Sequence, residues 1–340
     1  MSAPHDMHYD IVAQAFVEGG VVPFLGAGAS IADRDPSATS WTPGAGLPNG
    51  RELAEFLAQR TGFRSEEDED DEAAAAVPAG AAPAPPERLD LAEVTQWIDA
   101  WRGDQILYRH LHELFASSYR PTSAHRFLAR LAVALPLETR PRLYITTNYD
   151  DGMEQALAAR GIEHDLVWYQ VARREAPGVF VHQAPGARPV PVVLPDDYTE
   201  FDFDERPVVL KIHGAVHRDE PKEDSFVITE DNYIDYLGRA DPWQQLPVDL
   251  RAEIRLKSLL FLGYGLRDWN LRVLLSRIWA ERDGELAHWA IQHKPSLLEE
   301  KLWIRRGNVE LYDAPLRAYV SCLERRIRGL LGAQALPWHA

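Results

Sequence analysis

Residues 21–30 read VVPFLGAGAS, in which a continuous apolar run passes directly into a turn of glycine, alanine and serine. A run without polar alternation is typical of a strand that is buried on both faces of a parallel sheet. Small residues directly after such a strand let the backbone approach a pyrophosphate, whose charge is met by backbone N–H groups. Because Ile31 replaces the third glycine of the full Gly-x-Gly-x-x-Gly fingerprint, the turn alone is equally consistent with an ordinary tight turn.

Four later apolar runs have the same character and are also expected to be strands, at residues 143–146, 208–212, 259–262 and 288–291. Amphipathic helical patterns occur around and between them, at residues 51–59, 91–101, 105–117, 124–134, 152–159, 270–281 and 314–331. Strands that alternate with helices predict a Rossmann-like α/β fold with a doubly wound parallel sheet.

The organisation along the chain predicts one domain over residues 1–340, with a helical insertion at about 89–135. Residues 64–88 combine an acidic block with an alanine and proline tract. Too little of this stretch is apolar to offset the entropy of ordering it, so we expect a disordered segment there.

The composition predicts a cytoplasmic protein. The single cysteine, Cys322, excludes an intramolecular disulfide and a multi-cysteine zinc site, and we expect it to be a small buried hydrophobe in a helix. No apolar run reaches the roughly 18 residues that a membrane span needs, and the polar start is unlike an export signal. The net charge of −16 opposes direct nucleic-acid binding through the whole surface. Binding through a local basic patch at Arg325, Arg326 and Arg328 remains an alternative.

Glycines or short polar side chains follow four of the predicted strands. Ligands bind beyond the carboxyl ends of the strands in such a fold, so these tips are expected to converge on one cleft. The tips are Gly26-Ala27-Gly28, Thr147-Asn148-Tyr149-Asp150, His213-Gly214 and Gly263-Tyr264-Gly265. The two glycines of the last tip permit a second close approach of the backbone to the ligand.

The polar residues at the tips have a structural interpretation as well as a chemical one. Asn148 and Asp150 can hydrogen-bond a ribose and a carboxamide, or cap the helix that follows. For Asp151 and Asp268 we expect helix capping. A lone histidine is more often a packed or surface residue, but His213 is placed at the rim of the cleft, where a group that titrates near neutrality can act as a base. No His, Cys or Asp cluster has the spacing of a metal site, so no metal is expected.

Taken in order, the four tips resemble the bacterial sirtuin-like family of NAD hydrolases that act as effectors of anti-phage defence. The matching motifs are Gly-Ala-Gly-x-Ser, Thr-Thr-Asn-Tyr-Asp, His-Gly and Gly-Tyr-Gly-Leu-Arg-Asp, with lesser matches at residues 46–48 and 228–233. The resemblance extends from about Val21 to Asp313.

By that resemblance the substrate is NAD, and three residues carry the chemistry. Asn148 matches the family's catalytic asparagine, Asp150 its nicotinamide-pocket aspartate, and His213 the histidine that works on the ribose hydroxyls. The residues that would bind NAD are Gly26, Ala27, Gly28 and Ser30 at the pyrophosphate, Thr147, Asn148 and Asp150, and Gly263, Tyr264 and Gly265 near the adenosine half. A further adenosine-site segment corresponds to Gln292-His293 or to Val309-Glu310, and the sequence does not decide between them.

Two departures separate this chain from the related sirtuin deacylases. Those enzymes hold a zinc ion with four cysteines and have Thr-Gln-Asn-Ile-Asp at the second motif, whereas this chain has one cysteine and Thr-Thr-Asn-Tyr-Asp. Both departures favour hydrolysis of NAD to ADP-ribose and nicotinamide without a metal. The alternatives are a protein deacylase or ADP-ribosyltransferase on the same core, and a non-catalytic NAD or ADP-ribose sensor or assembly subunit.

The resemblance also implies regulation, because an NAD-depleting effector of abortive infection needs an inactive state. We expect gating by homo-oligomerisation or by a partner protein, such as a ring-forming ATPase translocase or another defence sensor. The helical segments 91–134 and 314–331 are candidate assembly surfaces, or equally helices that cover the sheet.

Overall fold

The computed structural model describes residues 4–35, 40–63, 89–171, 178–239, 241–265, 269–280 and 286–332. The segment 64–88, predicted to be disordered, lies outside these ranges, as does Asp268, predicted to cap a helix. Across the described ranges, no helix combines the length and the apolar character needed to cross a membrane.

A nine-stranded sheet runs through the molecule in the order β11-β10-β9-β1-β2-β6-β3-β4-β5. The strands from β11 to β3 in that order are mutually parallel, and β4 and β5 continue the sheet in antiparallel pairing. The bounds are β1 Val21–Leu25, β2 Leu143–Thr146, β3 Asp165–Gln170, β4 Val179–Gln183, β5 Val190–Pro191, β6 Val208–Lys211, β9 Ser258–Leu262, β10 His288–Gln292 and β11 Val309–Asp313. A small separate ladder pairs β7 (Gly214–Ala215) with β8 (Ser225–Phe226).

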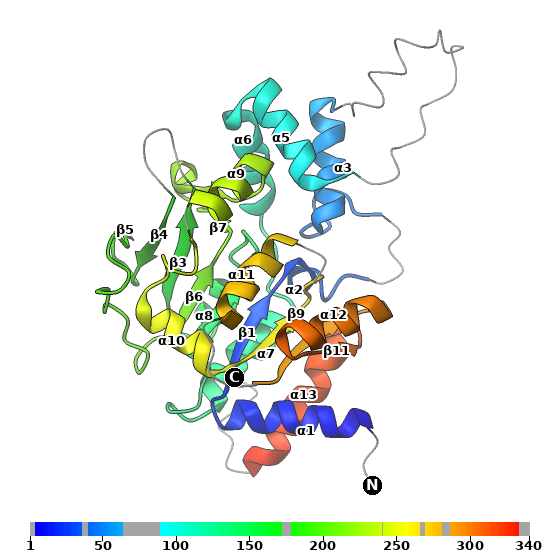
Figure 1. Ribbon diagram of the computed structural model, residues 1–340, viewed down its shortest axis with the longest axis vertical. Coiled ribbons are helices and arrows are strands. Elements are labelled where there is room, and N and C mark those ends of the chain that lie inside the picture. Colours follow the sequence, from blue (N-terminus) through cyan, green and yellow to red (C-terminus); the bar gives the residue numbers. More distant parts are fainter. Residues whose placement is uncertain are drawn as a thin grey trace.

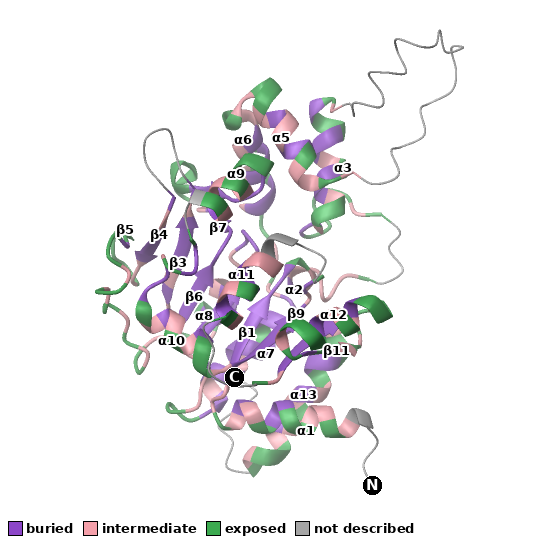
Figure 2. Cartoon of the chain, viewed as in Figure 1, coloured by how far each residue is buried: buried purple, intermediate pink, exposed green. Residues whose placement is uncertain are grey.

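The continuous apolar runs form the central strands because those strands are covered on both sides. Every residue of β1, β2, β6 and β9 is buried, and Figure 2 shows the sheet as the most deeply buried layer. All five predicted strands are confirmed, and so is the parallel-dominated α/β fold class. The strands β3, β4, β5 and β11 were not predicted, because polar residues interrupt or bound their apolar positions.

Helices cover both faces of the sheet and form two large cores (Figure 1). On one face lie α1 (Pro4–Val17), α7 (Ser123–Ala134), α8 (Gly152–Ala158) and α13 (Leu316–Leu331). On the other lie α10 (Val248–Leu256), α11 (Trp269–Ala280) and α12 (Leu297–Gly307). Cys322 lies in α13 as predicted, but it is only partly buried.

A third, smaller core is formed at one end of the molecule by α3 (Gly50–Thr61), α5 (Leu91–Arg102) and α6 (Asp104–Phe115). Figure 1 shows these helices beside the short helix α9 (Glu230–Ile234), and a turn of π-helix at Asp235–Arg239 follows α9. Residues 89–135, predicted to be one helical insertion, are therefore divided, since α5 and α6 join α3 whereas α7 packs on the sheet. We call α3, α5 and α6 the helical cap.

The reversal of strand order occurs at β1. The chain proceeds from β1 to its neighbour β2 on one side, and only later to β9 on the other side. The carboxyl ends of β1 and β9 thus lie together beneath the helical cap and the tiny helix α2 (Ala27–Ser30). Such a switch point is where doubly wound sheets bind their ligands.

Candidate active site

The tips of β1, β2, β6 and β9 line one cavity of about 430 Å³. Ten of the predicted site residues line it: Ala27, Gly28, Ser30, Thr147, Asn148, Asp150, His213, Gly263, Tyr264 and Gly265. Gly26 is not part of the lining, but its carbonyl accepts a hydrogen bond from the Asn148 side chain at 2.9 Å. The structure therefore brings together the residues that the sequence placed at separate strand ends.

The glycines of the β1 and β9 turns pack against each other. The Gly28 N–H donates to the Gly263 carbonyl at 2.8 Å, and a Cβ at Gly28 would lie 2.6 Å from that same oxygen. Gly263 has φ +67°, and a Cβ there would lie 2.2 Å from the Ala29 nitrogen. We expected these glycines to admit a ligand, but the contact that requires them is between the two turns. A Cβ at Gly265, in contrast, would have no neighbouring atom within 4 Å.

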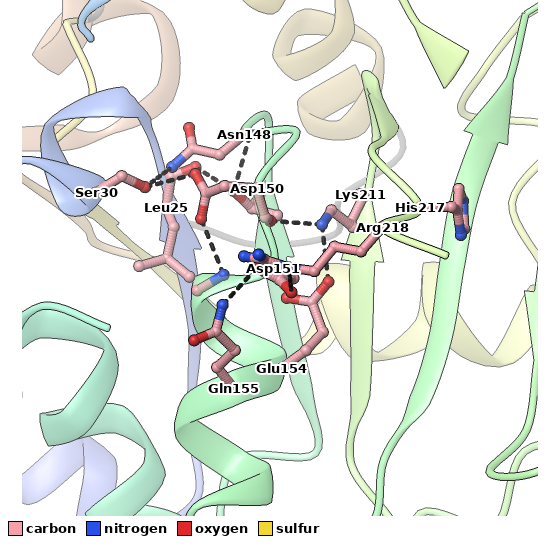
Figure 3. A network of polar contacts seen from close by, with 12 residues as sticks. Leu25, Ser30, Asn148, Asp150, Asp151, Glu154, Gln155, Lys211, His217 and Arg218 are labelled. Carbon is pink, nitrogen blue, oxygen red and sulfur yellow. Dashed lines mark hydrogen bonds and ion pairs between the residues drawn. The ribbon is translucent and has the colours of Figure 1, made fainter. Parts of the chain in front are cut away.

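Ser30 connects the two polar residues at the tip of β2. Its Oγ donates to Asp150 Oδ2 at 2.7 Å and accepts from Asn148 Nδ2 at 2.9 Å. The other Asp150 oxygen, Oδ1, accepts the Gly152 N–H at 2.9 Å. Figure 3 shows this network, with the Asn148 amide oxygen on the side away from Ser30. Both carboxylate oxygens of Asp150 are thus engaged within the protein, whereas the Asn148 oxygen faces away from these contacts.

The sequence analysis predicted that the Asp151 side chain caps α8, but this side chain makes no capping hydrogen bond. The side chain of Asp150 binds the first N–H of the helix instead, and Asp151 accepts from Tyr119 Oη at 2.5 Å and Arg218 Nε at 2.6 Å. Burial alone would raise the pKa of Asp151, but the hydrogen bonds from Arg218 and Tyr119 outweigh it and lower the pKa to about 2. This ion pair ties the start of α8 to the loop after β7, directly behind the site.

Lys211 is a polar residue beneath the site that the sequence analysis did not single out. It is fully buried, and its Nζ donates to the Asp150 carbonyl at 2.6 Å and to Glu154 Oε1 at 2.7 Å. Burial and the charge of Lys211 together lower the pKa of the nearby His217 to about 4. A signal was available, since Lys211 is the one charged residue of a strand whose other residues are Val208, Val209 and Leu210.

His213 lies just beyond β6 and is buried at the cavity wall. Its imidazole makes T-shaped contacts with two aromatic rings, whose centroids lie 5.8 Å away at Tyr233 and 5.7 Å away at Tyr236. Its carbonyl accepts the Val227 N–H at 2.8 Å. The ring is therefore fixed within the same cavity as Asn148 and Asp150.

The helical cap supplies an apolar wall opposite the polar tips. Leu53 of α3, Leu91 of α5 and Phe115 of α6 line the cavity, together with residues 47–49 before α3 and Gly50 at its start. Asn49 begins α3 through a capping box with Glu52, which fixes this approach segment. The cap residues were not predicted as site residues, although residues 46–48 had been noted as a lesser motif. One polar and one apolar wall suit a ligand that carries both hydroxyls and an aromatic ring.

Neither segment considered for the adenosine half lines the cavity. Val309 begins β11 and pairs with His288 at the start of β10. Val309-Glu310 therefore lies at the amino ends of the strands, whereas the cavity lies at their carboxyl ends. Gln292 does end β10. His293 after it is exposed, and its Nδ1 lies 3.7 Å from Asp313 Oδ1. In the described part of the chain, no group of His, Cys, Asp and Glu side chains is arranged to hold a metal ion.

Comparison with known proteins gives a consistent family. A family model described as a SIR2-like domain matches residues 142–312, a range that contains Asn148, Asp150, His213 and Gly263. The NAD(+) hydrolase ThsA of Enterococcus faecium is 28% identical over 208 residues, which are 60% of this chain and 35% of that protein. The protein of the same name from Acinetobacter baumannii is 28% identical over 190 residues, 56% of this chain and 31% of that protein. The chain thus spans about a third of the length of the curated relatives it matches.

Two solved structures are also similar along most of the chain. One, described as a SIR2 homologue in complex with NAD, has a TM-score of 0.38 and 15% identity, and the match covers 95% of both chains. The other, described as explaining the mechanism and regulation of Sir2 enzymes, has a TM-score of 0.41 and 11% identity over 95% of this chain and 97% of that one.

Proposed function

The chain belongs to the SIR2-like domain family, and from this membership we propose that it is an NAD hydrolase that cleaves NAD to ADP-ribose and nicotinamide. The observation that carries the proposal is the cavity at the β1/β9 switch point, whose lining includes Asn148, Asp150 and His213. The names of the curated relatives support the same activity. We propose that the chain is one domain and that this cavity is its catalytic site.

The reaction needs positioning more than a strong nucleophile. The pyridinium charge already activates the nicotinamide–ribose bond, and the protein must stabilise an oxocarbenium-like state while water approaches. The bond from the ribose carbon to the pyridinium nitrogen breaks, nicotinamide leaves with the electron pair, and the water oxygen bonds to the same carbon. One proton of that water must be taken up.

Asn148 and His213 divide this work in our proposal. The Asn148 nitrogen is committed to Gly26 and Ser30, so its oxygen accepts a hydrogen bond from the water or from a ribose hydroxyl. An amide oxygen is not a base at neutral pH, so we assign uptake of the proton to His213, because an imidazole nitrogen can accept one.

Asp150 seats the carboxamide of the leaving group in our proposal, held in place by Ser30 and Gly152. The turn residues Ala27, Gly28 and Ser30 are assigned to the pyrophosphate, with Thr147 beside them. Gly263, Tyr264 and Gly265 are assigned to the adenosine half.

In the cell we propose that the activity depletes NAD during anti-phage defence, under the control of oligomerisation or of a partner protein. The match covers only about a third of each of these two curated relatives, so most of each relative lies outside it. Control of the activity by further domains or by separate proteins is compatible with this partial coverage.

The test is to incubate purified protein with NAD, alone and with the product of the neighbouring gene, and to follow nicotinamide and ADP-ribose. We expect Asn148→Ala and His213→Ala each to lower the rate by about 100-fold or more. His293→Ala, outside the cavity and exposed, is the matched control and should keep the wild-type rate. Wild-type NAD loss in both site variants would refute these roles.

Product analysis separates the alternatives. Transfer of ADP-ribose or removal of an acyl group requires an acceptor or substrate protein, and free ADP-ribose in its absence indicates hydrolysis. Retained NAD binding with no turnover, even with the partner present, would favour the sensor function.

A further inference from the structure

A fully buried ammonium group lies beneath the candidate active site. Lys211 is the last residue of β6, between β2 and β3, where it pairs with Thr146 and Trp168. Its side chain is 1% exposed. The residues on either side of it, Leu210 and Ile212, are buried apolar side chains.

Two acceptors meet this ammonium group. It donates to the main-chain carbonyl of Asp150 at 2.6 Å and to the carboxylate of Glu154, on α8, at 2.7 Å. Figure 3 shows Lys211 reaching from β6 across to the start of α8, with Asp150 and Glu154 as its two partners. One side chain thus joins the strand that leads to His213 with the loop that carries Asn148 and Asp150.

Stability alone does not explain why a charge is buried here. The desolvation penalty of a buried ion is several kcal/mol, and replacement of a buried ion pair by apolar residues of similar volume is often neutral or stabilising. A methionine at residue 211 would continue an apolar strand. What a methionine cannot do is donate a hydrogen bond to the Asp150 carbonyl.

The hydrogen bond from Lys211 to the Asp150 carbonyl connects the two segments that carry the proposed catalytic residues. Strand β6 ends at Lys211, and the turn at residues 212–213 directly after it carries His213 to the cavity wall. The Lys211 contact sets the Asp150 main chain at a fixed distance from this segment. His213 approaches the cavity from the strand, and Asn148 and Asp150 approach it from the loop.

We propose that Lys211 is a positioning residue, which fixes the Asn148–Asp150 loop relative to His213 through the Asp150 carbonyl. The inference rests on the function proposed above and adds a determinant of its rate. A misplacement of about 1 Å at a reacting group lowers turnover by about 100-fold. Substrate affinity depends on many other contacts of the cavity and changes less.

The test compares two variants that both neutralise the partner carboxylate. The double variant Lys211→Met/Glu154→Gln removes the bond to the Asp150 carbonyl without leaving a buried carboxylate unpaired. The matched control Glu154→Gln keeps the ammonium group and that bond. We expect kcat for NAD to fall by about 100-fold in the double variant, with KM within about threefold of wild type, and kcat of the control to stay within about threefold.

Amide hydrogen exchange gives a readout that does not require turnover. We expect exchange at residues 148–152 to quicken by about tenfold or more in the double variant and to stay at the wild-type rate in the control. Wild-type exchange there in the double variant overturns the proposal. So does a control that loses as much kcat as the double variant, because the ion pair and not the carbonyl bond would then matter. If the wild-type protein does not cleave NAD, the proposed function fails, and the exchange rates alone decide whether Lys211 fixes the loop.

Discussion

Replacement of Gly263 by alanine tests the packing of the two turns at the switch point. The new Cβ would lie 2.2 Å from the Ala29 nitrogen and 2.4 Å from the Gly28 carbonyl carbon, both of them backbone atoms. The positive φ adds about 1–2 kcal/mol for a non-glycine residue, and overpacking against atoms that cannot rotate away adds about 1–3 kcal/mol. We therefore expect the free energy of unfolding to fall by about 2–5 kcal/mol.

Two other glycines separate these contributions in a urea-unfolding series. Gly62 has φ +73° but nothing within 4 Å of its Cβ position, so Gly62→Ala should lose only the dihedral part, about 1–2 kcal/mol. Gly265 has neither a positive φ nor a close neighbour, and Gly265→Ala should stay within about 0.5 kcal/mol of wild type. The reasoning is refuted if Gly263→Ala is no less stable than Gly62→Ala.

Two further predictions concern the polar network. Ser30→Ala removes the group that joins Asn148 to Asp150, and we expect NAD turnover to fall by about tenfold or more; a wild-type rate of nicotinamide release would contradict this. The pKa of Asp151 is about 2 in the folded protein, against 3.8 for an unperturbed aspartate. Its contribution of about 2 kcal/mol to the free energy of unfolding is therefore complete above about pH 5 and is lost as the pH falls towards 2. Arg218→Met should remove most of that contribution, so urea unfolding should show a larger loss at pH 6 than at pH 3, and an equal loss at both would exclude the assignment.

The parts of the fold predicted from the sequence are those whose pattern reflects complete burial. The strand at Val21–Leu25 is continuous and apolar because helices cover both of its faces. The strand β3 begins with Asp165, which is buried beside His182 and Arg206. A buried aspartate is tolerated there only because β4 and a distant loop supply its partners. A search for apolar runs along the sequence does not detect those partners.

The candidate site was predictable to the extent that parallel strands bring their ends together. Asn148, Asp150 and His213 could be placed in one cavity from topology alone. Hydrogen-bond partners were not predictable, because Asp150 and Asp151 are adjacent in sequence and equally able to cap α8. Arg218 and Tyr119, which are remote in sequence, bind Asp151 and leave the capping contact to Asp150.

The contact between the β1 and β9 turns has a consequence for how the protein is made. The ribosome synthesises residues 21–30 well before it translates their packing partner, the turn after Leu262. A nascent chain therefore lacks one wall of the cavity until that turn has been translated. If the protein destroys NAD as proposed, unfinished or prematurely terminated chains that stop before Ser258 are expected to be harmless to the cell that makes them.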